Sequence, residues 1–107
     1  MNASYVSNAK RRAEKRGWEF DLDAEFLWRL YLIQNKKCAL SGEPIFFYTR
    51  SKNRKNGNIS LDRKDSSEGY TKDNVHWVHK NINLMKMYLS QSEFLEWCGK
   101  VWKYRSV

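Results

Sequence analysis

The clearest periodic pattern in the chain lies at residues 23–36, where apolar side chains recur at helical spacing. Five residues form this apolar stripe: Phe26, Leu27, Leu30, Tyr31 and Ile33. Asp23 and Glu25 precede the stripe, and acidic side chains in a first turn suit the positive end of a helix dipole. The pattern predicts an amphipathic helix whose stripe packs in the core.

Two further helices are predicted near the ends of the chain. Residues 4–16 form the first, and Gly17 stands just beyond its end, where glycine is common. The second begins with a capping box from Ser90 to Glu93. Its expected buried stripe consists of Phe94, Leu95, Cys98, Val101 and Trp102. Both helices are therefore expected to pack against the middle of the chain.

The middle of the chain reads as short strands and turns. A Ser-Gly-Glu-Pro turn at 41–44 interrupts the segment "KKCALSGEPIFFY", and a strand is expected after it. Two more strands are expected at the two ends of the segment 58–77, and the second one continues into a short helix near His79. The predicted order is helix, helix, hairpin, helix, helix. We therefore expect an α+β fold that forms one domain over residues 1–107.

Composition narrows the classes of partner. The chain has 107 residues, a net charge of +8, and 41% hydrophobic and 15% aromatic residues. This apolar content suffices for a globular fold, and nucleic acid is the commonest partner of such a basic domain. An acidic membrane surface is the competing interpretation, but no apolar run approaches the roughly 20 residues of a membrane span. Two unpaired cysteines and the lack of a signal-like start predict a cytoplasmic protein.

Basic residues gather in two segments that could bind nucleic-acid phosphates. The members of the two groups are Lys10, Arg11, Lys15 and Arg16 on the first helix, and Arg50, Lys52, Arg54 and Lys55 in the loop 49–58. The competing interpretations are a solvated helix face and a hairpin tip that keeps a sheet edge soluble. The net charge of the whole chain favours phosphate binding.

The central segment also carries the candidate chemistry. If Ile59 and Leu61 face the core, Asp62 points the other way and meets the helix that follows the second strand. His79 and Asn83 are expected on one face of that helix. One carboxylate with an amide oxygen or an imidazole suits Mg²⁺ or Mn²⁺, which keeps several waters and takes phosphate ligands. A structural zinc ion is not expected, because too few cysteines and histidines are available.

The run "LDRKDSSEGYTKDNVHWVHKNINLMK" resembles the ββα-metal motif of HNH (His-Me finger) endonucleases, as found in small phage-type HNH proteins. The flanking helices and the Cys-x-x-Ser-Gly turn resemble the same group, so the likeness covers nearly the whole chain. It implies a hairpin and helix over about residues 59–87. The residues at the motif positions are Asp62 and Asn83 as metal ligands, Asn74 in the loop, Arg63 beside the metal, and Lys86 as a trailing lysine that contacts nucleic acid. A phage-encoded protein acting in a bacterial host fits this likeness.

The chain departs from the family pattern at two places. The paired zinc cysteines are reduced to Cys38, with Ser41, His79 and Ile82 at the other positions. Arg63 replaces the histidine that serves as the general base, and a guanidinium stays protonated. Arg63 is expected to brace the phosphate. The base is then His79, His76, Asp65 or metal-bound water, and Asn74 is expected to stiffen the loop.

Three functions remain open at this point. The first is a metal-dependent endonuclease or nickase that acts on double-stranded DNA. The second is a DNA-binding module that kept the HNH fold and lost catalysis, with Arg63 as the mark of that loss. The third is a basic RNA-binding or ribosome-associated protein, which the charge alone favours. The oligomeric state is left open.

Overall fold

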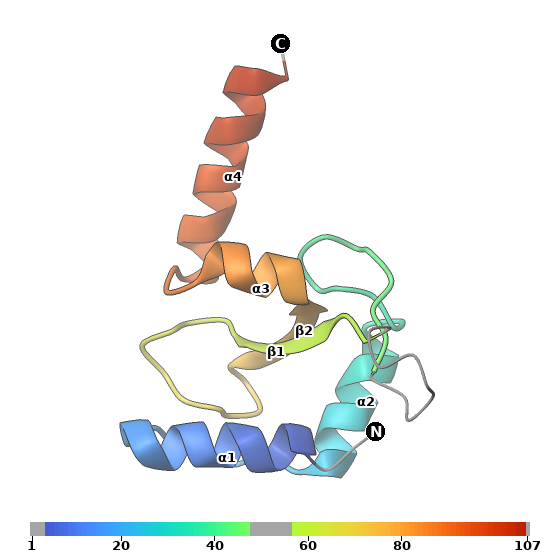
Figure 1. Ribbon diagram of the computed structural model, residues 1–107, viewed down its shortest axis with the longest axis vertical. Helices are drawn as coiled ribbons and strands as arrows, with labels where there is room; N and C mark the ends of the chain where they lie inside the picture. Colours follow the sequence, from blue (N-terminus) through green and yellow to red (C-terminus); the bar gives the residue numbers. More distant parts are fainter. Residues whose placement is uncertain (1–3, 48–56, 107) are drawn as a thin grey trace.

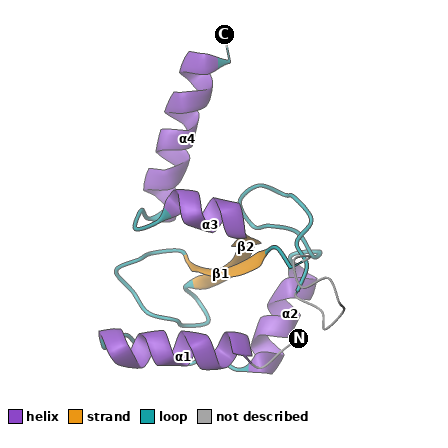
Figure 2. Cartoon of the chain, in the orientation of Figure 1, coloured by secondary structure: helices purple, strands orange, loops and turns teal. Residues whose placement is uncertain are grey.

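A computed structural model describes residues 4–47 and 57–106, and its elements follow the predicted order (Figure 1). The elements are α1 (Ser4–Arg16), α2 (Ala24–Ile33), β1 (Ile59–Arg63), β2 (Val75–His79), α3 (Lys80–Lys86) and α4 (Gln91–Arg105). The two strands form an antiparallel hairpin that lies between α3 on one side and α1 on the other (Figure 2). The predicted hairpin and helix unit over residues 59–87 is therefore present.

The register of the hairpin decides which side chains face α3. Asp62 lies directly opposite His76, and Leu61 lies opposite Trp77. Because side chains alternate along a strand, Asp62 and His76 share the face toward α3, while Leu61 and Trp77 share the other face. Trp77 is fully buried, and its indole nitrogen donates to the carbonyl oxygen of Leu27 on α2 at 2.8 Å. This anchor fixes the hairpin against the helical layer.

An aromatic cluster completes the core beneath the hairpin. The Phe47 ring lies 4.7–5.3 Å from the rings of Tyr5, Tyr31 and Trp77 in edge-to-face geometry. The Tyr31 hydroxyl donates to the carbonyl oxygen of Ile45 at 2.9 Å, so the polar end of this buried side chain is satisfied. The segment 45–47 packs well but forms no strand. The strand expected there is reduced to an isolated bridge between Lys37 and Pro44.

The long loop between β1 and β2 is held by the segment that joins α1 to α2. Tyr70 N donates to the Glu19 carbonyl at 2.9 Å, and Asp21 N donates to the Tyr70 carbonyl at 3.1 Å. A β-carbon on Gly69 would lie 2.3 Å from the Glu19 carbonyl oxygen, so only glycine permits this approach. The contact brings Trp18, which follows α1, next to the end of β1.

Two helices, α2 and α4, differ from the predictions. The second helix stops at Ile33 because Asn35 and Lys36 adopt positive φ, and Ile33 itself is 76% exposed. In α4, Phe94 is the only residue of the expected stripe that is buried. Leu95, Val101 and Trp102 are 47%, 61% and 73% exposed. The helix projects away from the body, so the predicted clasp by both terminal helices is wrong for α4 (Figure 1).

Within the described ranges, no helix combines the length and apolar character that crossing a membrane requires.

Candidate functional site

The central feature of the site is a buried ionic cluster around Asp62. One carboxylate oxygen of Asp62 lies 2.8 Å from His76 Nε2, and the other lies 3.2 Å from Lys86 Nζ. Lys86 Nζ also donates to the Arg63 carbonyl oxygen at 2.9 Å. Lys86 is 1% exposed, and a lysine is buried to this extent only when it is paired. The cluster ties β1, β2 and α3 together.

Lys86 therefore does not lie where the sequence suggested. We expected its ammonium group to contact nucleic acid, but the group is enclosed by the hairpin and binds Asp62. A lysine at the end of a short helix gives no sequence signal of burial, because lysine is mostly exposed. Lys86 is buried because its ammonium group pairs with Asp62 on the facing strand. In this position Lys86 holds the carboxylate rather than a phosphate.

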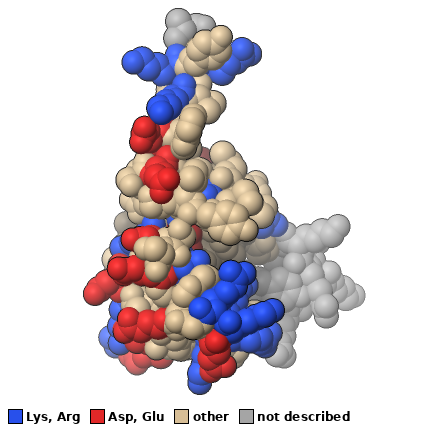
Figure 3. Space-filling model, turned by 90° about the vertical axis from the view of Figure 1, so that its left-hand side faces the viewer, with Lys and Arg blue, Asp and Glu red and all other residues tan. Residues whose placement is uncertain are grey.

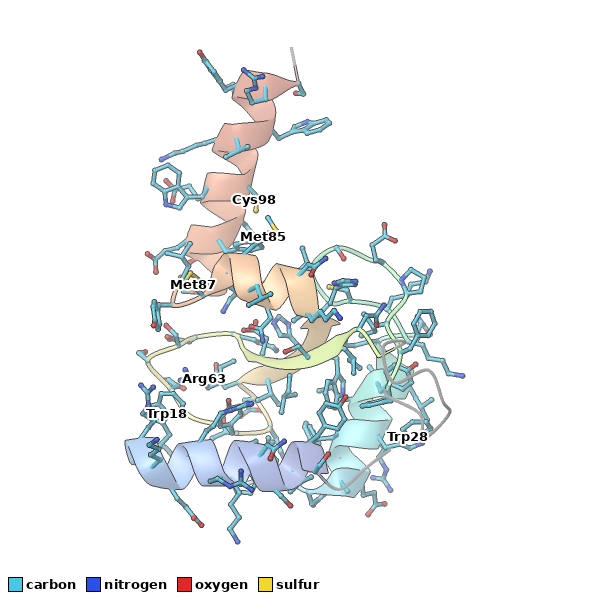
Figure 4. All side chains as sticks on the ribbon, viewed as in Figure 1. Trp18, Trp28, Arg63, Met85, Met87 and Cys98 are labelled. Carbon is cyan, nitrogen blue, oxygen red and sulfur yellow. The ribbon has the colours of Figure 1, made fainter. Side chains whose placement is uncertain are left out.

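Arg63 leaves β1 on the face opposite Asp62 and stacks on an aromatic ring. Its guanidinium carbon lies 3.5 Å from the centre of the Trp18 ring, and Figure 4 shows the two side chains together. Its Nη1 donates to the carbonyl oxygens of Ser66 and Glu68, each at 2.7 Å. Burial lowers the pKa of the Arg63 guanidinium from its usual value, although nearby Tyr70 and Asp62 oppose this effect. Arg63 remains a cation, so it can bind a phosphate but cannot act as a base.

Asp62 and Asn83 meet at the wall of one small cavity, as the sequence predicted. The cavity has a volume of about 110 Å³, and Arg12, Arg63 and Lys86 also line it. The Asn83 side-chain nitrogen donates to the Ser60 hydroxyl at 2.6 Å. That bond orients the amide, and no hydrogen bond to its oxygen is found among the described residues. A carboxylate and an amide oxygen thus face a cavity that three cations surround.

This donor set fits a divalent ion under one condition. Each oxygen of Asp62 keeps a lone pair beyond its one protein partner, and Asn83 offers its amide oxygen. Two oxygen ligands with waters suit Mg²⁺ or Mn²⁺. The neighbouring cations would repel an ion that came alone, so the arrangement requires a bound anion such as phosphate. In the part of the chain that the structure describes, no group of three or more His, Cys, Asp or Glu side chains is placed to hold a metal.

A wider cleft opens beside this cavity. It has a volume of about 520 Å³ and combines three arginines with aromatic side chains. The residues that define it are Arg12, Arg16, Trp18, Arg63, Tyr70 and Tyr88. Arg63 lines both hollows, and Arg12 Nη1 donates to the Tyr70 hydroxyl at 3.4 Å. Basic side chains cluster on part of the face shown in Figure 3, with acidic side chains beside them. Cations and aromatic faces together suit a nucleic-acid strand.

Of the two predicted groups of basic residues, only the group on α1 lies within the described residues. Arg16 lines the cleft, whereas Lys10, Arg11 and Lys15 are exposed on α1 and do not line it. Arg50, Lys52, Arg54 and Lys55 lie outside the described residues. Sequence reasoning missed Arg12, Trp18, Tyr70 and Tyr88. The spacing of Arg12 and Arg16, four residues apart on one helix, could have indicated a shared face.

Three residues that were considered for catalysis have structural roles. His79 caps α3, and its Nδ1 accepts from Asn81 N at 3.0 Å. It pairs with Ile59, three residues along the hairpin from Asp62, so it does not share the cavity. Asn74 bonds Asp65 and Gly69 and stiffens the loop, as expected. Ser67 bonds the Asp65 carboxylate and lowers its pKa, which makes Asp65 a weaker base.

His76 is the histidine that approaches Asp62, but it is buried and its Nε2 is directed at the carboxylate. Among the residues that line the two hollows, none is a histidine or a second carboxylate. None of the described side chains at the cavity wall is therefore assigned as the general base. Of the bases predicted from the sequence, metal-bound water is left.

Cys38, the one cysteine at the zinc positions of the resembled motif, lies in a small turn with Ser41. Cys38 is buried, and its sulfur accepts from Ser41 N at 3.4 Å. Burial acts to raise the pKa of the Cys38 thiol, but hydrogen bonds from Ser41 and from the backbone of His79 outweigh it and lower the pKa. Hydrogen bonds to a single thiol therefore hold together the turn and the start of α3.

Comparison with known proteins agrees with this architecture. The structure resembles that of PacI, a rare-cutting HNH restriction endonuclease, with a TM-score of 0.62 and 25% identity, over 97% of this chain and 80% of that one. The sequence is 32% identical over 91 residues to an uncharacterized 29.0 kDa protein of Enterobacteria phage T4 from the dda-modA intergenic region. That match covers 85% of this chain but spans only 34% of the phage protein. No protein-family model matches the chain.

The chain is thus a small mixed α/β domain with a two-stranded antiparallel sheet and an HNH-like fold. The likeness supports a nuclease-type or DNA-binding module.

Proposed function

We propose that this domain binds double-stranded DNA and hydrolyses its phosphodiester bonds as a metal-dependent HNH endonuclease or nickase. The observation that carries the proposal is the continuity of two hollows through Arg63. One hollow offers arginines and aromatic faces for a strand, and the other offers Asp62 and Asn83. A phosphate that enters from the cleft would reach the carboxylate and the amide together.

Each residue then has a defined task. Arg12 and Arg16 bind phosphates of the strand, because a basic cleft attracts and positions the DNA backbone. Arg63 binds the phosphate at the entrance to the small cavity and offsets negative charge that develops there. Its bonds to the Ser66 and Glu68 carbonyls and its stacking on Trp18 hold the guanidinium in place before DNA binds.

Asp62 and Asn83 would hold the divalent ion. Bound there, the ion supplies positive charge to the phosphate oxygen and lowers the pKa of a coordinated water. Lys86 and His76 keep the Asp62 carboxylate fixed on the face toward α3, and Ser60 fixes the Asn83 amide. These contacts maintain the geometry without the ion.

A cleavage assay on supercoiled plasmid tests the proposal. We expect nicked or linear product with Mg²⁺ or Mn²⁺ and none with chelator. Asn83→Ala should lower the rate at least about 100-fold, as loss of a metal-dependent electrostatic contribution commonly does. It should leave the fold intact, because Asn83 is half-buried and the one described hydrogen bond of its side chain joins it to Ser60. If the wild-type protein binds DNA but gives no cleavage product with any divalent metal, the proposed endonuclease activity is refuted.

A second candidate is a DNA-binding module without catalysis. The buried ion pairs of Asp62 favour it, because both carboxylate oxygens are already engaged. The same plasmid assay distinguishes the two, since only the enzyme changes the topology of the DNA. In the binding module, Asn83→Ala would leave DNA affinity and plasmid topology equal to those of the wild type.

A further inference from the structure

Three exposed apolar side chains line the arginine-rich cleft. They come from the end of α3 and the turn that follows it, and they are Leu84, Met87 and Tyr88. Each of them is between 66% and 80% exposed. Because all three line one hollow, they form a single patch, which we call the apolar rim. Apolar side chains that stay exposed together and are bordered by polar ones mark an interaction site.

The backbone that carries the apolar rim is held in place. Lys86, which precedes Met87, is buried, and its ammonium group pairs with Asp62. Met87 has a φ of 48°, a conformation that is uncommon for a residue other than glycine and that tends to occur at functional sites. The Tyr88 carbonyl oxygen accepts from the Ser66 hydroxyl at 2.6 Å. A partner that covers the rim therefore costs little backbone entropy.

The surroundings of the apolar rim indicate which partner fits it. Arg12, Arg16 and Arg63 line the same cleft, and none of the described residues that line it is acidic. A duplex matches this arrangement, because it offers apolar base faces between two negatively charged backbones. Met87 also lines the small cavity that contains Asp62. The rim thus lies beside the cavity that is proposed to receive the scissile phosphate.

We propose that Leu84 and Met87 form a wedge that enters between two base pairs from the minor groove, unstacks that step and kinks the duplex. This inference rests on the DNA binding of the proposed function and adds how the DNA is deformed beside the cleaved bond. Leucine and methionine are side chains that proteins insert between base steps in this way. Tyr88 stacks on a base that the wedge exposes, since every base has a π-face. Phosphate contacts by the cleft arginines offset the cost of unstacking.

Two methionines near the end of α3 provide a matched pair for the test. Met87 is 66% exposed and lines the cleft, whereas Met85 is 62% exposed and lines a groove against α4. Figure 4 shows Met85 beside Cys98 of α4 and Met87 at the turn that leaves α3. Met87→Ser and Met85→Ser therefore remove the same side chain at similar exposure, inside and outside the cleft. Circular dichroism checks that each variant folds.

Unwinding of a plasmid measures the wedge without knowledge of a target sequence. The protein is bound to closed circular DNA in chelator, which prevents metal-dependent cleavage, and a metal-independent topoisomerase then relaxes the DNA. An inserted side chain untwists the step that it opens. We expect wild type and Met85→Ser to lower the linking number equally. The double variant Leu84→Ser with Met87→Ser should shift it at least about twofold less at saturating protein.

Binding to a mismatched duplex provides the second measurement. A mismatch removes part of the unstacking cost, and about 1.4 kcal/mol corresponds to a factor of ten in affinity. Fluorescence anisotropy should therefore show that wild type and Met85→Ser prefer a short duplex with one mismatch by about tenfold. Met87→Ser should lose most of this preference. Its salt dependence should equal that of the wild type, because the phosphate contacts remain.

The two measurements separate failure of the wedge from failure of the proposed function. If the protein binds no DNA, both are refuted. If it binds DNA but neither unwinds the plasmid nor prefers the mismatch, the wedge alone is refuted. Equal effects of Met85→Ser and Met87→Ser would also refute the wedge, because only Met87 lines the cleft.

Discussion

Replacing Asp62 with alanine should destabilise the fold as well as the site. The substitution leaves Lys86 with a 1% exposed ammonium group whose remaining described partner is the Arg63 carbonyl. Removing one member of a buried ion pair commonly costs about 3–5 kcal/mol, because the other charge stays buried without compensation. Small domains have a total stability of roughly 5–15 kcal/mol. Asp62→Ala should therefore lose a large share of the free energy of unfolding.

Urea denaturation followed by far-ultraviolet circular dichroism measures this loss. With an m-value of about 2 kcal/mol/M, the midpoint should fall by about 2 M. The double variant Asp62→Leu with Lys86→Met removes both charges and should recover most of the stability, since apolar replacement of a whole buried pair is often neutral. A midpoint shift below about 0.5 M for Asp62→Ala would show that the Lys86 ammonium group becomes hydrated in the variant. The expected cost of an uncompensated buried charge would then be refuted. A loss of cleavage activity in Asp62→Ala can be assigned to catalysis only if urea denaturation shows that the variant is still folded under the assay conditions.

Two further predictions use neighbouring positions as matched controls. Arg12→Ala should weaken duplex DNA binding and reduce the salt slope by about one unit, whereas Arg11→Ala, which removes the same charge outside the cleft, should change both less. Fluorescence anisotropy across a salt series measures both, and equal effects would show that the cleft does not position DNA. Gly69→Ala should destabilise the domain, because its β-carbon would overlap the Glu19 carbonyl. Gly99→Ala in α4 meets open space and should stabilise by about 0.5–1 kcal/mol, so thermal melts that shift alike would contradict the assigned contact.

The part of the site that sequence could predict is the part built from short-range rules. Strand alternation and helix spacing bring Asp62 and Asn83 to one cavity, because both patterns act within the 59–87 unit. The end of α1 and the start of α4 followed from Gly17 and Ser90, whose roles at helix ends depend on local backbone geometry. These features need no knowledge of how distant segments pack.

The features that were missed depend on long-range packing. Trp18 reaches Arg63 because the loop at Gly69 docks on Glu19, and no periodicity joins residues so far apart. Lys86 is buried because an acidic side chain faces it from β1, which a pattern of exposed lysines cannot reveal. The stripe of α4 was correctly identified as apolar, but periodicity does not tell whether an apolar face meets its own chain or another one.

The same packing implies that metal and DNA bind together under the proposed function. The cavity contains one carboxylate and three cations, Arg12, Arg63 and Lys86, so its net charge is positive before any ligand arrives. A divalent ion alone adds to that charge, whereas a phosphate reduces it and supplies oxygen ligands. Each ligand therefore raises the affinity for the other, and the coupling must be reciprocal. Under the proposed function, Arg63 contributes to this coupling, because its guanidinium is a permanent cation at the cavity wall.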